Sequence, residues 1–313
     1  MYLPYLRGRQ YELLALRELA EKDLINNKIL PIIEPIKPSA TLLKTMGMFI
    51  EKEKDLAVIR NPQVGNFKKD ISTSKKEGWK KDFSEALENK SIVISHIMNE
   101  NSNNELIELF NSGVKENELI VINKNKDFIS NYVEIFETQN PRYALIPEER
   151  AFKRKINVNP VLIEDRFKKE ARNADYKAID SRAFSEDHLY FEEEGFMGYS
   201  DYSIVGEEYS ESGFAPYAVA IHIVYFDTDN SLRVKHFVSN SNEDINDPAG
   251  KFGEALGKLV EWKKATNINT YGLEKFVEHS SNETYPGLGT VKKLAIMHHI
   301  ELISQYFDGV HNK

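Results

Sequence analysis

The sequence predicts an α/β protein built as a (β/α)8 barrel of the TIM type, and two observations carry that prediction. Eight short apolar runs are spaced along the chain up to about residue 206, and segments of helical length and pattern follow most of them. The runs are almost continuously apolar, as expected of parallel strands buried on both faces. A doubly wound open sheet is the alternative, but eight units in one chain favour the barrel.

The expected elements alternate in regular order. The first strand covers residues 3–7, and the helix after it places Leu13, Leu16 and Leu19 on one face. The other strands are expected at 29–36, 56–61, 91–97, 119–123, 143–147, 161–165 and 202–206, and the other helices at 39–53, 75–89, 103–112, 126–138 and 148–155.

An antiparallel β-hairpin is predicted after the eighth strand. Residues 218–226 and 232–238 are rich in strand-forming side chains, and the turn Asp227-Thr228-Asp229-Asn230 separates them. A barrel does not need this hairpin, so residues 217–240 are interpreted as an insertion. Two C-terminal helices are expected at about 248–265 and 289–306. Without an internal repeat or a low-complexity linker, residues 1–313 are predicted to form a single elaborated domain.

Composition excludes several classes of protein. The chain has 41% hydrophobic and 29% charged residues, which is typical of a globular protein that buries a core. A net charge of -8 argues against a general polyanion-binding surface, and zero cysteines exclude disulfides, thiol nucleophiles and Cys-ligated metals. Residues 1–25 are too charged for a signal peptide and the apolar runs are only strand length, so a soluble cytoplasmic protein without a membrane contact is expected.

Charge is distributed unevenly along the chain. Residues 183–231 contain many acids and no Lys or Arg, whereas residues 60–81 contain Arg60 and six lysines. Two oppositely charged solvated surfaces are one interpretation. The other is an acidic lid around a cation or a basic partner, with the lysine-rich loop holding a phosphate. Phe67, Trp79 and Phe83 lie among these lysines, as on a nucleic-acid surface, but a helix that packs Trp79, Phe83 and Leu87 on the barrel is the preferred interpretation.

Active sites of this fold lie at the carboxyl ends of the strands, where this sequence places a ring of polar residues. Four of them are candidates for catalysis: Glu34, His96, Glu164 and Asp165. Seven others are candidates for ligand binding: Arg7, Arg9, Arg60, Asn61, Asn123, Lys124 and Glu207.

Glu34 is the most informative of these positions, because its carboxylate interrupts the apolar run Leu30–Ile36. Burying a charge costs several kcal/mol unless the charge is paired or ligated. Arg7 and Arg60 lie on the two neighbouring strands of the predicted barrel, so either could pair with it. A structural ion pair, metal ligation together with Glu164 or Asp165, and binding of a ligand's hydroxyls or amine remain open.

The histidines and the last glycines give weaker signals. His96 is either a general base or a rim histidine held by a backbone partner. His298 and His299 are adjacent on a helix and point about 100° apart, which does not suit one metal ion. Residues 285–293 place two glycines and two lysines at a helix start, which suits an anion site or a tight turn, and the spacing is not that of a nucleotide fingerprint.

Both ends of the chain resemble the Beta protein family of phages and bacteria. The N-terminal part of the resemblance is the run Tyr5–Leu16 followed by Pro31-Ile32-Ile33-Glu34-Pro35, and the C-terminal part is the run Pro286–Leu302, which is similar to a bacterial branch. The resemblance implies a barrel-like single domain and a setting among phage, mobile-element or defence genes. It implies no reaction and no catalytic residues.

Two hypotheses about function follow. The first is a barrel that binds a small anionic, phosphorylated ligand through Arg7, Arg9 and Arg60, and that hydrolyses a phosphoester with a divalent metal ion held by Glu34, Glu164, Asp165 or Glu207. The second is a non-catalytic partner-binding component of a phage-defence or phage-encoded module, which docks a protein through its hairpin and acidic segment. The metal, the substrate and the partner are not specified by the sequence.

Overall fold

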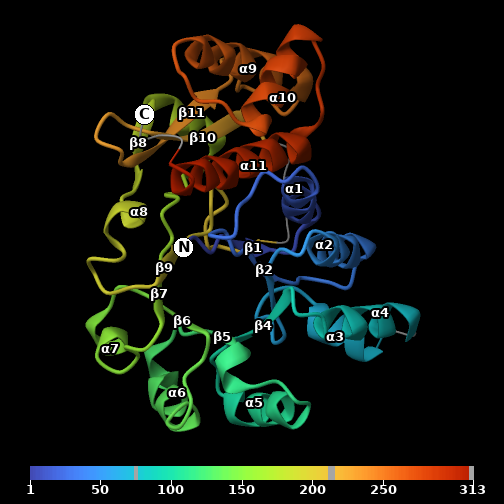
Figure 1. Ribbon diagram of the computed structural model, residues 1–313. Coiled ribbons are helices and arrows are strands. Elements are labelled where there is room, and N and C mark those ends of the chain that lie inside the picture. Colours follow the sequence, from blue (N-terminus) through green and yellow to red (C-terminus); the bar gives the residue numbers. More distant parts are fainter. Residues whose placement is uncertain (74–76, 211–215, 310–313) are drawn as a thin grey trace. The chain divides into compact units, whose positions relative to one another are not determined.

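The computed structural model of the protein describes residues 1–73, 77–210 and 216–309 (Figure 1). The chain forms two compact units. The barrel unit contains Met1–Asp23, Asn27–Glu164 and Tyr190–Tyr202. The C-terminal unit contains Leu24–Asn26, Asp165–Leu189 and the described residues from Ser203 onward. That the chain behaves as a single domain stays a prediction.

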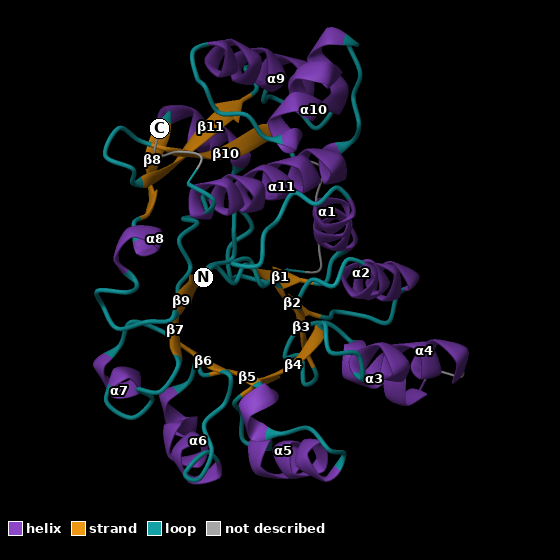
Figure 2. Cartoon of the chain, in the orientation of Figure 1, coloured by secondary structure: helices purple, strands orange, loops and turns teal. Residues whose placement is uncertain are grey.

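The barrel unit confirms the predicted fold class. Eight parallel strands pair in the order β1-β2-β3-β4-β5-β6-β7-β9 (Figure 2). Their bounds are β1 (Tyr5–Arg7), β2 (Ile32–Glu34), β3 (Leu56–Ile59), β4 (Ile92–Ile97), β5 (Ile120–Ile122), β6 (Tyr143–Ile146), β7 (Pro160–Ile163) and β9 (Gly198–Ser200). The ring closes where the Leu3 amide donates to the Tyr199 carbonyl, at 2.8 Å.

Helices surround this ring. They are α1 (Gln10–Glu21), α2 (Ala40–Glu51), α3 (Phe67–Thr73), α4 (Glu77–Leu87), α5 (Ser102–Asn111), α6 (Ile129–Ile135) and α7 (Arg150–Lys153), with 3₁₀ turns η1 (Glu116–Glu118) and η2 (Lys126–Phe128). Caps set some of their starts: the Ser39 side chain accepts a hydrogen bond from the Leu42 amide at the start of α2. The helix expected at 75–89 is α4, and residues 75 and 76 lie outside the described residues.

The prediction of the eighth barrel strand was wrong in position. The strand is β9 at Gly198–Ser200, not residues 202–206. Only three residues of β9 pair with β7, and none of them is aliphatic, so no apolar run marks the strand. Ile204 and Val205, which made 202–206 resemble a strand, are buried within the C-terminal unit without forming one.

Side-chain alternation along the strands decides which residues reach the barrel interior. Residues two apart share a face, and the interior cluster takes alternate positions: Leu3, Tyr5, Leu30, Ile32, Ala57, Ile59, Val93, Ile97, Ile120, Ile122, Leu145, Val161, Ile163 and Tyr202. By this register Arg7, Glu34 and Lys124 continue the inward-facing rows. Arg60 and His96 fall on the outward-facing rows, toward the helices.

The C-terminal unit is built on the predicted hairpin. Its strands β10 (Ala220–Phe226) and β11 (Leu232–Val238) form an antiparallel sheet together with β8 (Ser181–Ser185), in the order β10-β11-β8. The expected C-terminal helices are present as α9 (Pro248–Lys264) and α11 (Leu288–Phe307), with α10 (Tyr271–Ser281) between them and η3 (Asn173–Ala178) and α8 (Asp187–Tyr190) near β8. Strand β8 and helix α10 were not predicted.

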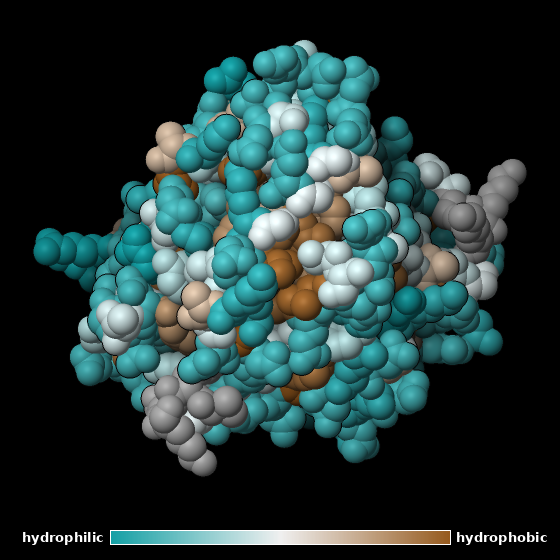
Figure 3. Space-filling model, turned by 90° about the horizontal axis from the view of Figure 1, so that it is seen from above, coloured by the Kyte–Doolittle hydropathy of each residue, from teal (hydrophilic) through white to brown (hydrophobic). Residues whose placement is uncertain are grey.

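Polar side chains dominate the face of the molecule drawn in Figure 3, with apolar residues exposed in a limited central area. Within the described residues, no helix is both long enough and apolar enough to cross a membrane.

Candidate functional site

The carboxyl end of the barrel holds a buried ion pair. Glu34 is fully buried, and its carboxylate accepts hydrogen bonds from the Arg7 guanidinium, from the Tyr5 hydroxyl at 2.6 Å and from the backbone amide of Gln63 at 2.7 Å. Strand register explains the pair, because Arg7 and Glu34 are direct partners in the β1–β2 ladder. Of the two arginines that the sequence offered to Glu34, the structure therefore selects Arg7.

Two tyrosine rings and a second cation complete this cluster. The rings of Tyr5 and Tyr202 lie 5.0 Å apart, and both are buried. The Arg7 guanidinium lies 5.2 Å and 5.4 Å from their centroids, and the Lys124 ammonium lies 5.8 Å and 5.2 Å from them. Burial and the Glu34 carboxylate together raise the pKa of the Tyr5 hydroxyl, so Tyr5 stays a neutral hydrogen-bond donor. The cluster thus combines a buried ion pair with two aromatic rings at the carboxyl end of the barrel.

The carboxylates proposed as metal ligands do not form a site. Among the residues that the structure describes, no group of three His, Asp or Glu side chains is placed to hold a metal ion. Glu34 is paired with Arg7, and a Glu164 carboxylate oxygen accepts a hydrogen bond from the Glu148 backbone amide. Asp165 belongs to the C-terminal unit, where its two oxygens accept the amides of Phe167 and Glu207. Glu34 is thus paired with a cation, Glu164 and Asp165 accept from backbone amides, and metal ligation stays a prediction.

His96 lies on the outward-facing side of β4, within a polar network. Its Nε2 lies 2.8 Å from the Ser102 hydroxyl and 3.4 Å from the Asn61 amide nitrogen. Burial lowers the pKa of His96 to about 4, so the ring is neutral at pH 7 and too weak a base for general base catalysis there. The partners of His96 are side chains, not the backbone group that the sequence suggested.

Glu105 organises the same network. Partial burial alone would raise its pKa, but hydrogen bonds from Asn99, Lys68 and Asn61 outweigh burial and lower it. The Asn61 side chain thus links the segment after β3 to the last residue of β4. Its Oδ1 accepts a hydrogen bond from the Ile97 backbone amide, and its Nδ2 donates one to the Ile97 carbonyl.

The serine, histidine and glutamate in this network do not form a catalytic triad. A triad needs the acid on the ring nitrogen opposite the serine. Here the Glu105 carboxylate approaches the same nitrogen as Ser102, at 3.9 Å, and Ser102 itself is fully buried.

We therefore expect Ser102 to be structural. Replacing Ser102 with Ala should lower the free energy of unfolding by about 1 to 2 kcal/mol, because the buried His96 and the Asn99 amide each lose a hydrogen-bond partner. Urea denaturation measures this loss. Covalent labelling of Ser102 in the folded protein by a fluorophosphonate, detected by mass spectrometry, would contradict a structural role.

Arg60 differs from the other candidate residues in the surroundings of its charge. It follows β3 on the outward-facing row and is half-buried. Its guanidinium lies 5.6 Å from the centroid of Phe83. Within the described chain, no carboxylate pairs with this side chain and no hydrogen bond holds it, so burial lowers the pKa of Arg60 without any opposing contribution. Arg60 is therefore a partly buried positive charge whose burial is not offset by an anion among the described residues.

Arg60 lines a pocket of about 350 Å³ between α3 and α4, which we call the Arg60 pocket. Its volume lies at the lower end of the range for small-molecule sites. Its walls combine aromatic and cationic side chains: Arg60, Phe67, Lys68, Ile71, Trp79, Lys80, Phe83 and Ser84. Trp79 stacks on Phe83, with centroids 5.0 Å apart and planes 17° apart, and the Trp79 indole donates to the Ser39 carbonyl.

The remaining predicted residues lie elsewhere. Arg9 is the half-buried residue before α1. Asn123 is buried, and its Oδ1 has no partner in the described structure. His298 bonds to Thr270 and to the Val224 carbonyl, and His299 bonds to Ser203. In the acidic segment, Glu211 lies outside the described residues.

The fold and the site define a (β/α)8-type barrel protein with a cationic, aromatic-lined pocket beside its third strand. No family model, no curated protein and no solved structure matches the chain. The resemblance to the Beta protein family therefore stays a prediction from the sequence motifs.

The sequence showed the members of the Arg60 pocket but not their arrangement. On α4, Phe83 and Leu87 are buried as expected, and Phe67 of α3 packs against Phe83. The side-chain alternation along β3 could have predicted that Arg60 points outward, toward the helices that carry these aromatic residues.

Proposed function

We propose that the barrel unit binds a small aromatic anion of the mononucleotide type in the Arg60 pocket. The observation that carries this proposal is the Arg60 guanidinium, half-buried and without a described anionic partner, in the wall of a pocket. A phosphate or carboxylate would supply the missing negative charge through bidentate hydrogen bonds, which guanidinium groups form readily.

The other charges of the pocket favour the same class of ligand. Lys68 is paired with Glu105 at 2.7 Å and Lys80 with Glu77 at 3.1 Å, so their net contribution is small. Arg60 leaves an uncompensated positive charge, and no acidic side chain lines the pocket. Such a site attracts a monoanion or dianion and disfavours a cation.

The aromatic walls favour a planar ligand over an aliphatic phosphate. Trp79 is the partly exposed member of its stack, whereas Phe83 beneath it is buried. Stacking of a nucleobase on an aromatic side chain stabilises binding by about 1 to 3 kcal/mol. A ligand with both an aromatic ring and an anionic group would stack on Trp79 and pair with Arg60.

Tryptophan fluorescence tests the proposal directly. The chain has two tryptophans, so the Trp262→Phe variant leaves Trp79, in the pocket wall, as the reporter. We expect AMP to quench Trp79 saturably. Adenosine, which lacks the phosphate, and ribose 5-phosphate, which lacks the base, should each bind at least about tenfold more weakly.

Two variants complete this experiment. Arg60→Met should weaken AMP binding at least about tenfold without lowering the free energy of unfolding by more than about 1 kcal/mol, because only the contact with Phe83 is lost. Lys81→Met is the matched control, since Lys81 lies on α4 outside the pocket lining. Equal AMP affinity in the Arg60 and Lys81 variants would refute the proposal.

The other hypotheses have less support. Metal-assisted phosphoester hydrolysis is not part of the proposal, because the described carboxylates do not form a metal site. Partner binding through the hairpin is the alternative, but β10 and β11 form most of the C-terminal unit's own sheet. A phage or defence setting and a cytoplasmic location stay predictions.

A further inference from the structure

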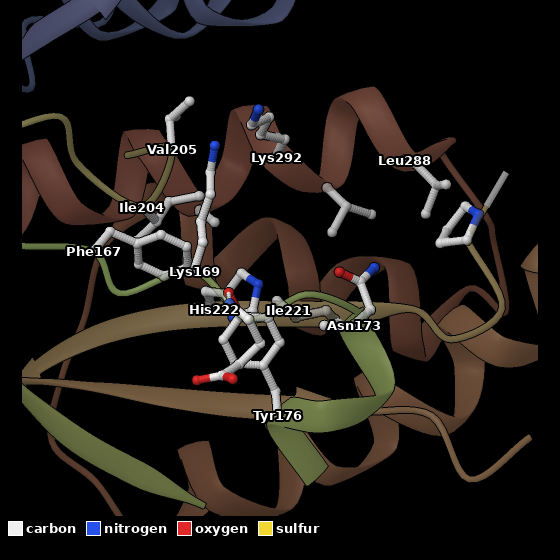
Figure 4. Close-up of a pocket in the computed structure, with 15 residues that line it drawn as sticks. Phe167, Lys169, Asn173, Tyr176, Ile204, Val205, Ile221, His222, Leu288 and Lys292 are labelled. Atoms are coloured by element: carbon white, nitrogen blue, oxygen red, sulfur yellow. Dashed lines mark hydrogen bonds between the residues drawn. The ribbon is translucent and has the colours of Figure 1, made fainter. Parts of the chain in front are cut away.

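A second pocket, of about 330 Å³, lies entirely within the C-terminal unit (Figure 4). We call it the His222 pocket. Helix α11, strand β10, the η3 turn and the segments around Phe167 and Ile204 form its walls. Apolar side chains such as Ile221, Val291 and Ala295 supply much of the lining. This volume suits a ring or a short alkyl chain rather than a macromolecule.

A histidine pair sets the polar chemistry of this pocket. His222 lines it, and its Nδ1 lies 2.8 Å from Nδ1 of His236. One of these nitrogens must donate and the other accept, so both rings cannot be protonated at this contact. Burial lowers the pKa of His222 to about 3 and that of His236 to about 4, so both rings are neutral near pH 7.

The environment of His236 selects the tautomers. Nε2 of His236 is buried and has no hydrogen-bond partner in the described structure. A buried N–H without an acceptor is rarer than a buried lone pair without a donor. His236 is therefore protonated at Nδ1 and donates to His222, which leaves the His222 proton on Nε2. The pocket thus contains a fixed N–H donor that the histidine pair does not use.

Two lysines add positive charge. In the view of Figure 4, the amino groups of Lys169 and Lys292 lie on the same side of the pocket, and Tyr176 lies on the other. The Lys169 ammonium donates a hydrogen bond to the Glu208 carbonyl at 3.1 Å, and its ion pair with the Glu208 carboxylate is solvent-exposed at 3.8 Å and therefore weak. Glu170 is the acidic residue of the lining, and the Arg182 guanidinium neutralises it at 2.6 Å.

From this arrangement we infer that the C-terminal unit binds a small amphipathic organic acid, with its apolar body against α11 and β10 and its carboxylate toward Lys169 and Lys292, on the side of the pocket away from His222 and Tyr176. A carboxylate only accepts hydrogen bonds, which matches two ammonium groups. This site is distinct from the Arg60 pocket, which lies in the barrel unit.

The fluorescent probe 8-anilino-1-naphthalenesulfonate has the required chemistry, an aromatic body with an acid group. It should be titrated into the Arg60→Met protein, in which the pocket of the barrel unit is inactivated. We expect saturable binding with one site per chain, displacement by octanoate, and roughly tenfold weaker displacement by octanol.

Lys292→Met should weaken binding of the probe roughly tenfold, whereas Lys293→Met, its neighbour on α11 outside the lining, should not. Ala295→Leu, which fills the pocket, should also prevent binding. Equal affinities in the Lys292 and Lys293 variants would overturn the inference. Displacement by octanol as effective as that by octanoate would overturn it too, because the site would then be merely apolar.

Discussion

Arg7→Met is expected to lower the free energy of unfolding of the barrel unit by about 3 to 5 kcal/mol, because it leaves the Glu34 carboxylate fully buried without its cation. Two neutral donors, the Tyr5 hydroxyl and the Gln63 amide, would remain on Glu34, but neither supplies positive charge. Urea denaturation of the Trp262→Phe protein measures the loss, since Trp79 then reports on the barrel unit.

The double variant Arg7→Met, Glu34→Gln is the control. The neutral amide keeps its oxygen as the acceptor for the Gln63 backbone N–H, its NH2 group can donate to the Tyr5 hydroxyl, and it no longer needs a cation, so a large part of the lost stability should return. If instead the stability losses of Arg7→Met and Glu34→Gln simply add in the double variant, the two side chains do not interact energetically, and their ion pair does not stabilise the barrel.

Acid should destabilise the C-terminal unit through its buried histidines. Burial lowers the pKa of His298 to about 4 and that of His299 to about 3. The unfolded chain binds a proton at each site near pH 6.5 while the folded chain does not, so the stability present above that pH is lost as the pH falls. For His298 the loss between pH 7.5 and pH 5 is about 2 kcal/mol.

Glu301 acts in the opposite direction. Burial raises the pKa of Glu301 to about 7, so its contribution to stability is present below the usual carboxyl pKa and is lost as the pH rises through about 7. Denaturation of the Trp79→Phe protein, followed by Trp262, should therefore show a smaller decrease in stability upon acidification for His298→Gln and a larger one for Glu301→Gln. Identical pH dependence in the two variants would contradict these assignments.

Much of the barrel could be predicted from sequence because its strands are apolar on both faces. Seven of the eight strands coincide with apolar runs, whereas β9 was not predicted because its three residues, Gly198, Tyr199 and Ser200, form no apolar run. The Arg7–Glu34 pair was among the alternatives, since a carboxylate inside an apolar strand demands a partner.

The candidate sites were harder to predict, because they depend on the face from which each strand presents its side chains. A one-residue difference in register separates Arg60 from the barrel interior and places it among the aromatic residues of α3 and α4. The His222–His236 pair depends on the antiparallel register of β10 and β11, in which the two residues lie directly opposite each other. The turn between the two strands sets that register, but neither histidine belongs to a recognisable motif of the sequence.

A crystal structure of the protein with AMP is the most direct test of a ligand site at Arg60. We expect density for the phosphate within hydrogen-bonding distance of the Arg60 guanidinium and for the base against Trp79, with the Arg7–Glu34 pair unchanged. Density for AMP beside Lys124 at the barrel axis, or an empty Arg60 pocket at saturating AMP, would contradict this expectation.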